Sequence, residues 1–562
     1  MKQAARNWLQ QSGSHNVEVR LASLSSLIAG FLLRNRMVTS VFLISVPIGT
    51  IVLSTFSEYF FHRWNKPFRS GSRGGLAVGC TLVPLLLVAT CVCAESHNAR
   101  NLDILYYYVC VASACSLMTM LSTVCLMAPP PNNYGIVVMA SIVLSAIGWN
   151  FVPQLLPGYL WLLVPLWGYS AIVLLLLWAL PNSFSAGEVA MVGQGIFLLF
   201  FDVSLQTLRQ LHLMDVPKMF VYDRNLSSLA AEVMVTYSLM VGVVIVWPWT
   251  SALSSPWCLR HLQLLMSSHK RWSIVLMCWL AASIVFFLAP WMQLVMNVNI
   301  VLWTFRFLFS LTRAMLCGYW AICLVVAFFL VRQGFVQRKI LLANRFQLMM
   351  SRKKFHFLAV AVFLPGLVLD QEFMIFASGI AIMLFVILEY IRSLRVWPIG
   401  TTLDQYLRPF VDSRDCGNAI LTHIYLLVGF AVPCFAFPLS HFNSAPKLAT
   451  YAGVLSLGFG DSAASLCGMR WGRLKWSKLH KTVEGSLAFL TAQLLACYAI
   501  SLVDKSASTH FFGYWQCVVG ALVAVAVMEA FTGHIDNLIL PPYLYALLAL
   551  SAKLDSAVRS LL

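Results

Sequence analysis

The sequence predicts an all-α, polytopic integral membrane protein with about 15 transmembrane helices. Of its 562 residues, 60% are hydrophobic and only 10% are charged, whereas charged residues make up about a quarter of an ordinary soluble domain. The mean hydropathy is +0.80. The formal charge of +17 comes from cations that lie between apolar segments and not on one soluble face. This distribution favours a membrane as the surrounding medium and argues against nucleic acid as a partner.

Apolar segments long enough to cross a bilayer follow one another through the first half of the chain. They cover residues 37–57, 74–95, 103–128, 134–153, 158–180, 187–206, 230–250 and 272–290, and the stretch 300–331 holds one span or two. Charged residues lie mainly in the connections, and this half shows no phosphate or metal motif. We therefore expect residues 1–334 to form an N-terminal transmembrane helical bundle.

A basic stretch orients the second half. Between Arg332 and Lys354 there are seven cations and no acid, which by the positive-inside rule places this loop in the cytosol. Three pairs of apolar segments follow, at 355–369 with 373–391, 419–440 with 447–468, and 486–503 with 511–530. Three successive hairpins return four polar loops to the cytosolic side. We expect residues 335–562 to form a second membrane domain whose polar groups gather at that face.

The stretch from Gly453 to Ser486 carries the chemistry expected of that face. It starts as an apolar segment, and we expect a break at Gly458 and Gly460 with Asp461 placed at the break. Five cations follow in a loop, namely Arg470, Arg473, Lys475, Lys478 and Lys481. A metal-bound polyphosphate needs a carboxylate for the ion, cations for the phosphate oxygens, and glycines where the backbone approaches closely.

Each part of this stretch also has a purely structural interpretation. An Asp beside a Gly commonly caps a helix or closes a turn, and cations in a membrane loop commonly set topology. An acid near the end of an apolar span is costly to keep there, which favours a functional role for Asp461. Asp415 lies at a predicted helix start, where it either caps the helix or assists Asp461.

Five ordered blocks in the second half resemble the dolichol kinase family, the polyprenol kinases that phosphorylate dolichol with CTP. The blocks are RKKFHFLAVAVFLPG (352–366), DSRDCGNAILTHIYLLVG (412–429), LGFGDSAAS (457–465), KTVEGS (481–486) and HIDNLILPP (534–542). The glycine-aspartate block and the Lys-Thr-x-Glu-Gly block are also similar to those of CTP-dependent phytol and diacylglycerol kinases. The resemblance is close from about residue 335 onward and rests on hydropathy alone before it.

The resemblance implies a CTP-dependent dolichol kinase in the endoplasmic reticulum membrane, with its active site facing the cytosol, that supplies dolichyl phosphate for protein glycosylation. Its CTP-binding segment would run from Met469 to Ser486. The implied contacts within this segment are Gly472, Arg473, Lys475, Lys481, Thr482, Glu484 and Gly485. Gly460 and Ser462, on either side of Asp461, are further candidates for nucleotide binding.

Phosphoryl transfer asks the protein mainly to align the reactants and to neutralise charge on the transferring group. We expect Asp461, helped by Asp415, to hold a divalent cation such as Mg²⁺. Lys481, with Arg473 and Lys475, would hold the triphosphate. Either carboxylate could take up the proton of the acceptor alcohol. The polyprenol chain would lie among the spans in the membrane lipid, with its hydroxyl at the interface.

Other functions fit parts of the same pattern. A CTP-using lipid cytidylyltransferase would need the same acid and basic loop, and it differs by its product, a CDP-lipid instead of a lipid monophosphate. Another lipid-alcohol kinase, of the phytol or diacylglycerol type, would differ only in its acceptor. A membrane transporter would place polar groups near mid-membrane on broken helices of both halves. Here they gather at one interface of one half, which disfavours transport.

Overall fold

The computed structural model describes residues 2–48, 68–69, 75–96, 102–126, 160–213, 225–242, 269–336, 345–407, 419–436, 446–476 and 481–561. Every regular element among these residues is a helix, which confirms the predicted all-α class. Eight of the described helices are long and apolar enough to cross a membrane, so the chain is a multi-pass membrane protein. They cover Leu76–Glu95, Leu102–Met120, Ala186–Gln210, Lys270–Met296, Leu311–Gly334, Gln371–Ser393, Val483–Val503 and Asp536–Ser560. The predicted span at 134–153 lies outside the described residues.

The chain divides into two compact units, one made of residues 1–201, 217–223 and 429–562, the other of residues 202–216 and 224–428. The predicted domain boundary between residues 334 and 335 falls inside the second unit and stays a prediction about function. Two helices, α8 (Ala186–Gln210) and α20 (Thr422–Ala436), each contribute residues to both units.

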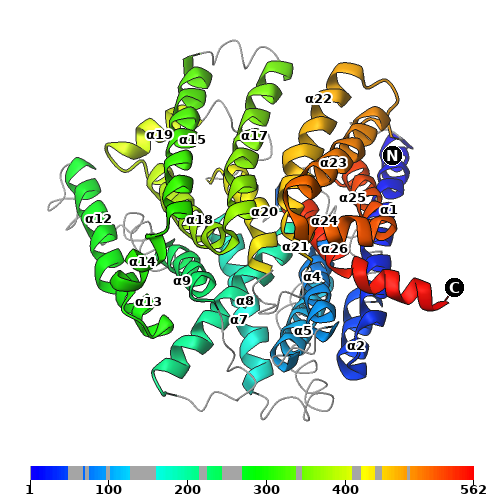
Figure 1. Cartoon of the computed structure of the whole chain (residues 1–562), viewed down its shortest axis with the longest axis horizontal. Coiled ribbons are helices and arrows are strands. Elements are labelled where there is room, and N and C mark those ends of the chain that lie inside the picture. Colours follow the sequence, from blue (N-terminus) through cyan, green and yellow to red (C-terminus); the bar gives the residue numbers. More distant parts are fainter. Residues whose placement is uncertain are drawn as a thin grey trace. The chain divides into compact units, whose positions relative to one another are not determined.

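The first unit brings the two ends of the chain together. From its N-terminal part come α1 (Lys2–Leu32), α2 (Arg36–Leu43), η1 (Ile44–Ile48), α4 (Leu76–Ser96), α5 (Leu102–Leu126) and α7 (Leu160–Ala179). From its C-terminal part come α21 (Lys447–Thr450), η6 (Val454–Asp461), α22 (Ser462–Trp471), α23 (Val483–Val503), α24 (Lys505–Gly513), α25 (Trp515–Phe531) and α26 (Asp536–Leu561). In Figure 1 the red helix α26 lies beside the blue helices α1 and α4, and both pairs are in contact.

Apolar packing explains why α26 lies there. The helix α4 is apolar around its whole circumference and is buried along most of its length, as expected of a helix surrounded by others. Leu544 and Tyr545 of α26 are fully buried. The hydroxyl of Tyr543 lies 2.8 Å from that of Ser25 in α1, so the polar end of this buried ring is satisfied.

The segment around Asp461 remains helical, so the predicted break at Gly458 and Gly460 is wrong. Residues Val454–Asp461 form a π-helix that continues directly into α22. Tertiary packing holds the helix together here, because a Cβ at Gly460 would approach the ring of Phe489 in α23 to 2.8 Å. The glycine therefore serves close helix packing and not a chain break. π-Helical turns inside helices are frequent at functional sites.

The segment predicted as one span at 511–530 is two helices. α24 and α25 meet at Tyr514 with a bend of 90°. At the start of α24, the carboxylate of Asp504 accepts hydrogen bonds from the backbone N–H groups of Ser506 and Ala507 and pairs with Lys447 at 2.9 Å. Asp504 thus caps the N-terminus of α24 and has a charged partner, so it determines where α24 begins.

The second unit is built around α18 (Gln371–Ser393), which packs on α9 (Leu226–Val241) and α17 (Arg345–Leu369). Its other helices are α12 (His269–Ser283), η4 (Ile284–Leu288), α13 (Ala289–Met296), α14 (Ile300–Leu308), α15 (Leu311–Val336) and α19 (Ile399–Leu407). The tip of the α17–α18 hairpin is tied to α15, because Arg313 pairs with Asp370 at 2.7 Å. The predicted stretch 300–331 therefore contains two helices, of which only α15 is long enough to span.

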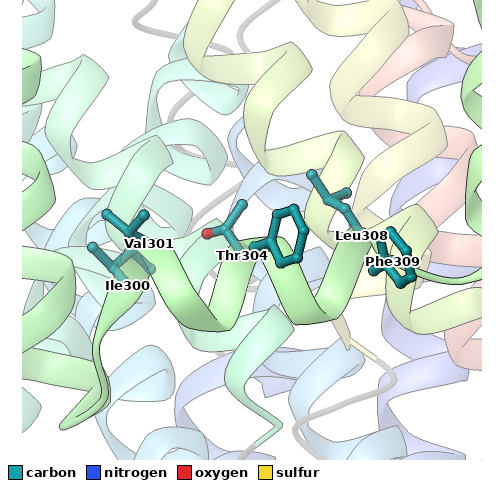
Figure 2. Close-up of a pocket in the computed structure, with 6 residues that line it drawn as sticks. Ile300, Val301, Thr304, Leu308 and Phe309 are labelled. Carbon is teal, nitrogen blue, oxygen red and sulfur yellow. The ribbon is translucent and has the colours of Figure 1, made fainter.

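The face of α14 in Figure 2 is apolar. The side chains along it are those of Ile300, Val301, Thr304, Phe305, Leu308 and Phe309. This shallow hollow carries no charged group, so it suits hydrocarbon and offers nothing to a nucleotide. The functional site has to be sought where acids and cations meet.

Candidate functional site

Lys481, directly before α23, is the centre of a charged cluster in the first unit. Its ammonium lies 3.0 Å from the carboxylate of Glu529 near the end of α25 and 3.2 Å from that of Asp536 at the start of α26. It also donates to the backbone carbonyl of Glu529 at 2.5 Å. One cation thus joins three helix ends.

Burial would lower the pKa of Lys481, but the charges of Asp536, Glu529 and Asp461 raise it above its ordinary value. The lysine is therefore a permanent cation. Its side chain is 25% exposed, compared with 6% for Glu529. The cluster contains more acidic than basic side chains. Of Lys481, Glu529 and Asp536, Lys481 has the most exposed side chain.

Asp461 lies at the junction of η6 and α22 and is 8% exposed. Its backbone has helical angles and its side chain makes no capping hydrogen bond, so the helix-cap interpretation does not account for it. The hydroxyl of Ser465, one turn later, lies 3.4 Å from one carboxylate oxygen. An acid kept in a buried helix, close enough to Lys481 to affect its pKa, is consistent with a functional role.

The predicted CTP-binding segment forms a short hairpin between α22 and α23, and its residues 477–480 lie outside the described part. Lys475 and Thr482 form an antiparallel β-bridge. The carboxylate of Glu484 accepts hydrogen bonds from the backbone N–H groups of Arg473 and Leu474 at 2.9 and 3.0 Å. Glu484 therefore fixes the loop backbone, while the side chains of Arg473 and Lys475 are exposed.

The remaining predicted nucleotide contacts, in this segment and beside Asp461, take part in local structure. Thr482 caps α23 by accepting from the N–H of Gly485 at 3.2 Å. A Cβ at Gly472 would lie 2.1 Å from the carbonyl oxygen of Gly468, so the chain can leave α22 this closely only with glycine there. The hydroxyl of Ser462 is buried and lies 3.4 Å from the carbonyl of Leu457.

The structure gathers some of the predicted residues and not others. Asp461, Lys481 and the hairpin belong to one unit, and the helix that carries Asp461 packs on α23. Asp415 lies outside the described residues. Glu529 was missed from the sequence, because it stands alone in an apolar run 48 residues away from Lys481. The sequence feature that could have identified Glu529 is its acidic side chain in an apolar run, since an ionisable residue inside a span is a functional candidate by default.

The donor set suits a divalent cation that arrives with a nucleotide. Carboxylate oxygens are the ligands that Mg²⁺ prefers, and it commonly takes one or two of them together with substrate phosphates. Among the described residues no group of three His, Cys, Asp or Glu side chains forms a complete metal cage. Asp461 is the residue that would hold such an ion by one carboxylate, with oxygens of the bound phosphates supplying further ligands.

Comparisons with known proteins agree on one family. The family model described as dolichol kinase matches residues 67–451. A dolichol kinase of Bos taurus is 28% identical over 521 residues, covering 89% of this chain and 91% of that protein. Dolichol kinase EVAN of Arabidopsis thaliana is 30% identical over 590 residues, covering 96% and 94%, and a dolichol kinase of Mus musculus is 36% identical over 270 residues, covering 46% and 49%. No solved structure matches the chain.

Proposed function

This chain belongs to the dolichol kinase family, and we propose that it transfers the γ-phosphoryl group of CTP to the terminal hydroxyl of dolichol. The products are dolichyl phosphate and CDP, and the lipid phosphate would serve glycan-carrier synthesis and protein glycosylation. The enzyme would lie in the endoplasmic reticulum membrane with about 15 spans, and its transfer centre would face the cytosol.

The observation that carries the proposal is the contact of Lys481 with Glu529 and Asp536 just before α23, beside the helix that carries Asp461 and packs on α23. Phosphoryl transfer depends on a fixed cation for the phosphate oxygens and a carboxylate for the metal ion. Lys481 supplies the first, because its pKa is raised and it remains charged. Asp461 supplies the second, because its carboxylate is held in a buried helix near that lysine.

Lys481 reaches the nucleotide by exchanging one of its partners. Its ammonium group has three donors, which meet Glu529 and Asp536. A triphosphate oxygen is a stronger anionic acceptor than the backbone carbonyl of Glu529, so it can take that position. The exposed side chains of Arg473 and Lys475 then attract the polyphosphate from solution.

The chemical step moves one phosphoryl group. The dolichol oxygen bonds to the γ-phosphorus, the bond from that phosphorus to the bridging oxygen of CDP breaks, and the alcohol proton goes to a carboxylate. The proposed acceptor of that proton is one of the two predicted carboxylates, Asp461 or Asp415. A bound Mg²⁺ would neutralise charge on the triphosphate. Lys481 stabilises the charge on the leaving β-phosphate.

The donor can be tested with purified full-length protein in lipid nanodiscs. Dolichol is supplied with either CTP or ATP labelled in the terminal phosphate, and label in the lipid fraction is counted. We expect label on dolichol from CTP and little from ATP. Equal transfer from both would contradict the CTP assignment, because the recognition would then lie in the triphosphate alone.

The cytosolic orientation gives a second expected result. In a variant without native cysteines, single cysteines at Thr402 and Lys475 should react with a membrane-impermeant maleimide added outside sealed microsomes. Single cysteines at Glu372 and Ser506 should react only after permeabilisation. All four side chains are exposed, so accessibility does not confound sidedness. Reaction of Ser506→Cys in sealed vesicles would contradict the predicted topology, because the 21-residue helix α23 separates residue 506 from Lys475 on the opposite side of the membrane.

A further inference from the structure

The short segment between α25 and α26, residues 532–535, is held by buried polar side chains from the N-terminal part of the first unit. Glu18 is fully buried, Glu188 is 1% exposed, and Arg69 is 5% exposed. His534 on the segment, which lies near Glu188, is 2% exposed. The segment leads directly into Asp536, which holds Lys481. We refer to Glu18, Arg69, Gly75 and Glu188 as the N-terminal clamp.

Glu188, in the first turn of α8, makes the central contacts of the clamp. One of its carboxylate oxygens accepts from the backbone N–H of Ile535 at 3.3 Å and lies 3.9 Å from Nδ1 of His534. The same oxygen is paired with Arg69 at 2.9 Å. The other oxygen accepts from the N–H of Ser185 at 2.9 Å, so both oxygens of Glu188 have partners.

Glu18 and Gly75 hold the same segment from two further positions. The carboxylate of Glu18 accepts from the backbone N–H of Gly533 at 2.8 Å. Gly75, directly before α4, has a φ of +54° and meets the imidazole of His534 so closely that a Cβ would lie 1.7 Å from the ring. Only glycine adopts this backbone conformation without strain and leaves room for the ring.

This arrangement is better suited to fixing a position than to adding stability. Buried ion pairs are weak contributors to stability, because apolar residues of the same volume often replace them without loss. Here the carboxylates of Glu18 and Glu188 accept from two backbone N–H groups of a four-residue segment, and Glu188 also lies near the ring of His534. These contacts are made with the segment and not with the helix faces that form the core. These contacts determine the position of the backbone at the start of α26, where Asp536 lies.

We propose that the N-terminal clamp is a positioning device for the transfer centre, with Glu188 as its principal positioning residue. It fixes residues 532–535, so that Asp536 holds the Lys481 ammonium where the nucleotide phosphate arrives. The inference rests on the proposed function of Lys481 in phosphoryl transfer. It gives the N-terminal part of the chain, in which the sequence shows no phosphate or metal motif, a positioning role in the reaction.

The test compares Glu188→Gln with Glu95→Gln in the full-length protein. Glu95 is a matched control, because it is equally buried and its carboxylate accepts from Tyr106 and the backbone N–H of Arg34, away from the segment. Hydrogen–deuterium exchange is measured over residues 532–538, where the amides of Gly533 and Ile535 report the clamp's hydrogen bonds directly. Both variants should melt earlier, but only Glu188→Gln should exchange faster in that peptide.

The kcat per folded enzyme distinguishes positioning from a purely structural role, because a loss of stability alone would leave it unchanged. Glu188→Gln should lower kcat per folded enzyme by about 10- to 100-fold, the range for residues that orient a working group, with the KM for dolichol unchanged. Glu95→Gln should keep its kcat. An unchanged exchange rate over 532–538, or a kcat no lower than that of Glu95→Gln, would overturn the proposal.

A second pair of variants tests the fit of Gly75 against His534. Gly75→Ala should reduce kcat because its methyl group displaces the imidazole. Added to His534→Ala, it should cause little further loss of kcat per folded enzyme, because the ring it displaces is gone, while the strained backbone at residue 75 still costs stability. Losses that multiply in the double variant would contradict the clamp.

The wild type is assayed first. If it places no label on dolichol, the proposed function is refuted. If the wild type is active and the clamp variants keep its kcat, only the positioning role is refuted.

Discussion

Replacing Asp461 by Asn is expected to remove nearly all phosphoryl transfer, by at least about a hundredfold, while the protein remains inserted and folded. The amide keeps the size of the side chain and can still accept from Ser465. It loses the negative charge, and amides are much poorer ligands than carboxylates for a hard cation. The loss should not be rescued by raising the magnesium concentration over the range that saturates the wild type.

The matched control for this variant is Asp504→Asn. Asp504 is buried like Asp461, but it caps α24 and pairs with Lys447. Because Asn caps helices as well as Asp does, this change should affect stability modestly and transfer hardly at all. If Asp461→Asn behaves like Asp504→Asn, with near-normal lipid phosphate formation, Asp461 has only a structural role.

Replacing Lys481 by Ala is expected to cost about 2–4 kcal/mol of transition-state stabilisation, the scale of one preorganised charge donor. It should also lower the melting temperature, because Glu529 is buried and loses its charged partner. Lys447→Ala is a close control. Lys447 is 27% exposed, compared with 25% for Lys481, and it too pairs with a buried acid of the first unit.

A double variant separates the two effects of Lys481. Lys481→Met combined with Glu529→Gln removes both charges of the pair, so most of the lost stability should return. Activity should stay low, because the cation fixed beside Glu529 and Asp536 is gone. Recovery of transfer along with stability would show that Lys481 acts only as a structural ion-pair partner.

Long apolar segments were the most predictable part of the fold. The segments at 74–95 and 373–391 are the helices Leu76–Ser96 and Gln371–Ser393, because an uninterrupted apolar run in lipid satisfies its backbone only as a helix. The bend at Tyr514 and the π-helix before Asp461 were not predictable in this way. The π-helix packs against a residue distant in the sequence, with Phe489 against Gly460.

The site was predictable in its residue types and not in its partners. The prediction that Asp461 and Lys481 belong together came from their spacing around a loop, and both lie in the same unit. No sequence pattern indicates that Glu529 and Asp536 both contact that lysine or that Glu188 holds the adjoining segment. Such contacts join residues 48 to 347 positions apart, and no local pattern encodes them.

The most direct measurement of the central claim follows two labels from CTP to dolichol in the same purified enzyme. One sample of CTP is labelled in the γ-phosphate and the other in the α-phosphate, and Asp461→Asn is assayed beside the wild type. A dolichol kinase places only the γ label on the lipid, and the variant places almost none. Incorporation of the α label, which a cytidylyltransferase would give, or full γ transfer by Asp461→Asn would contradict this account.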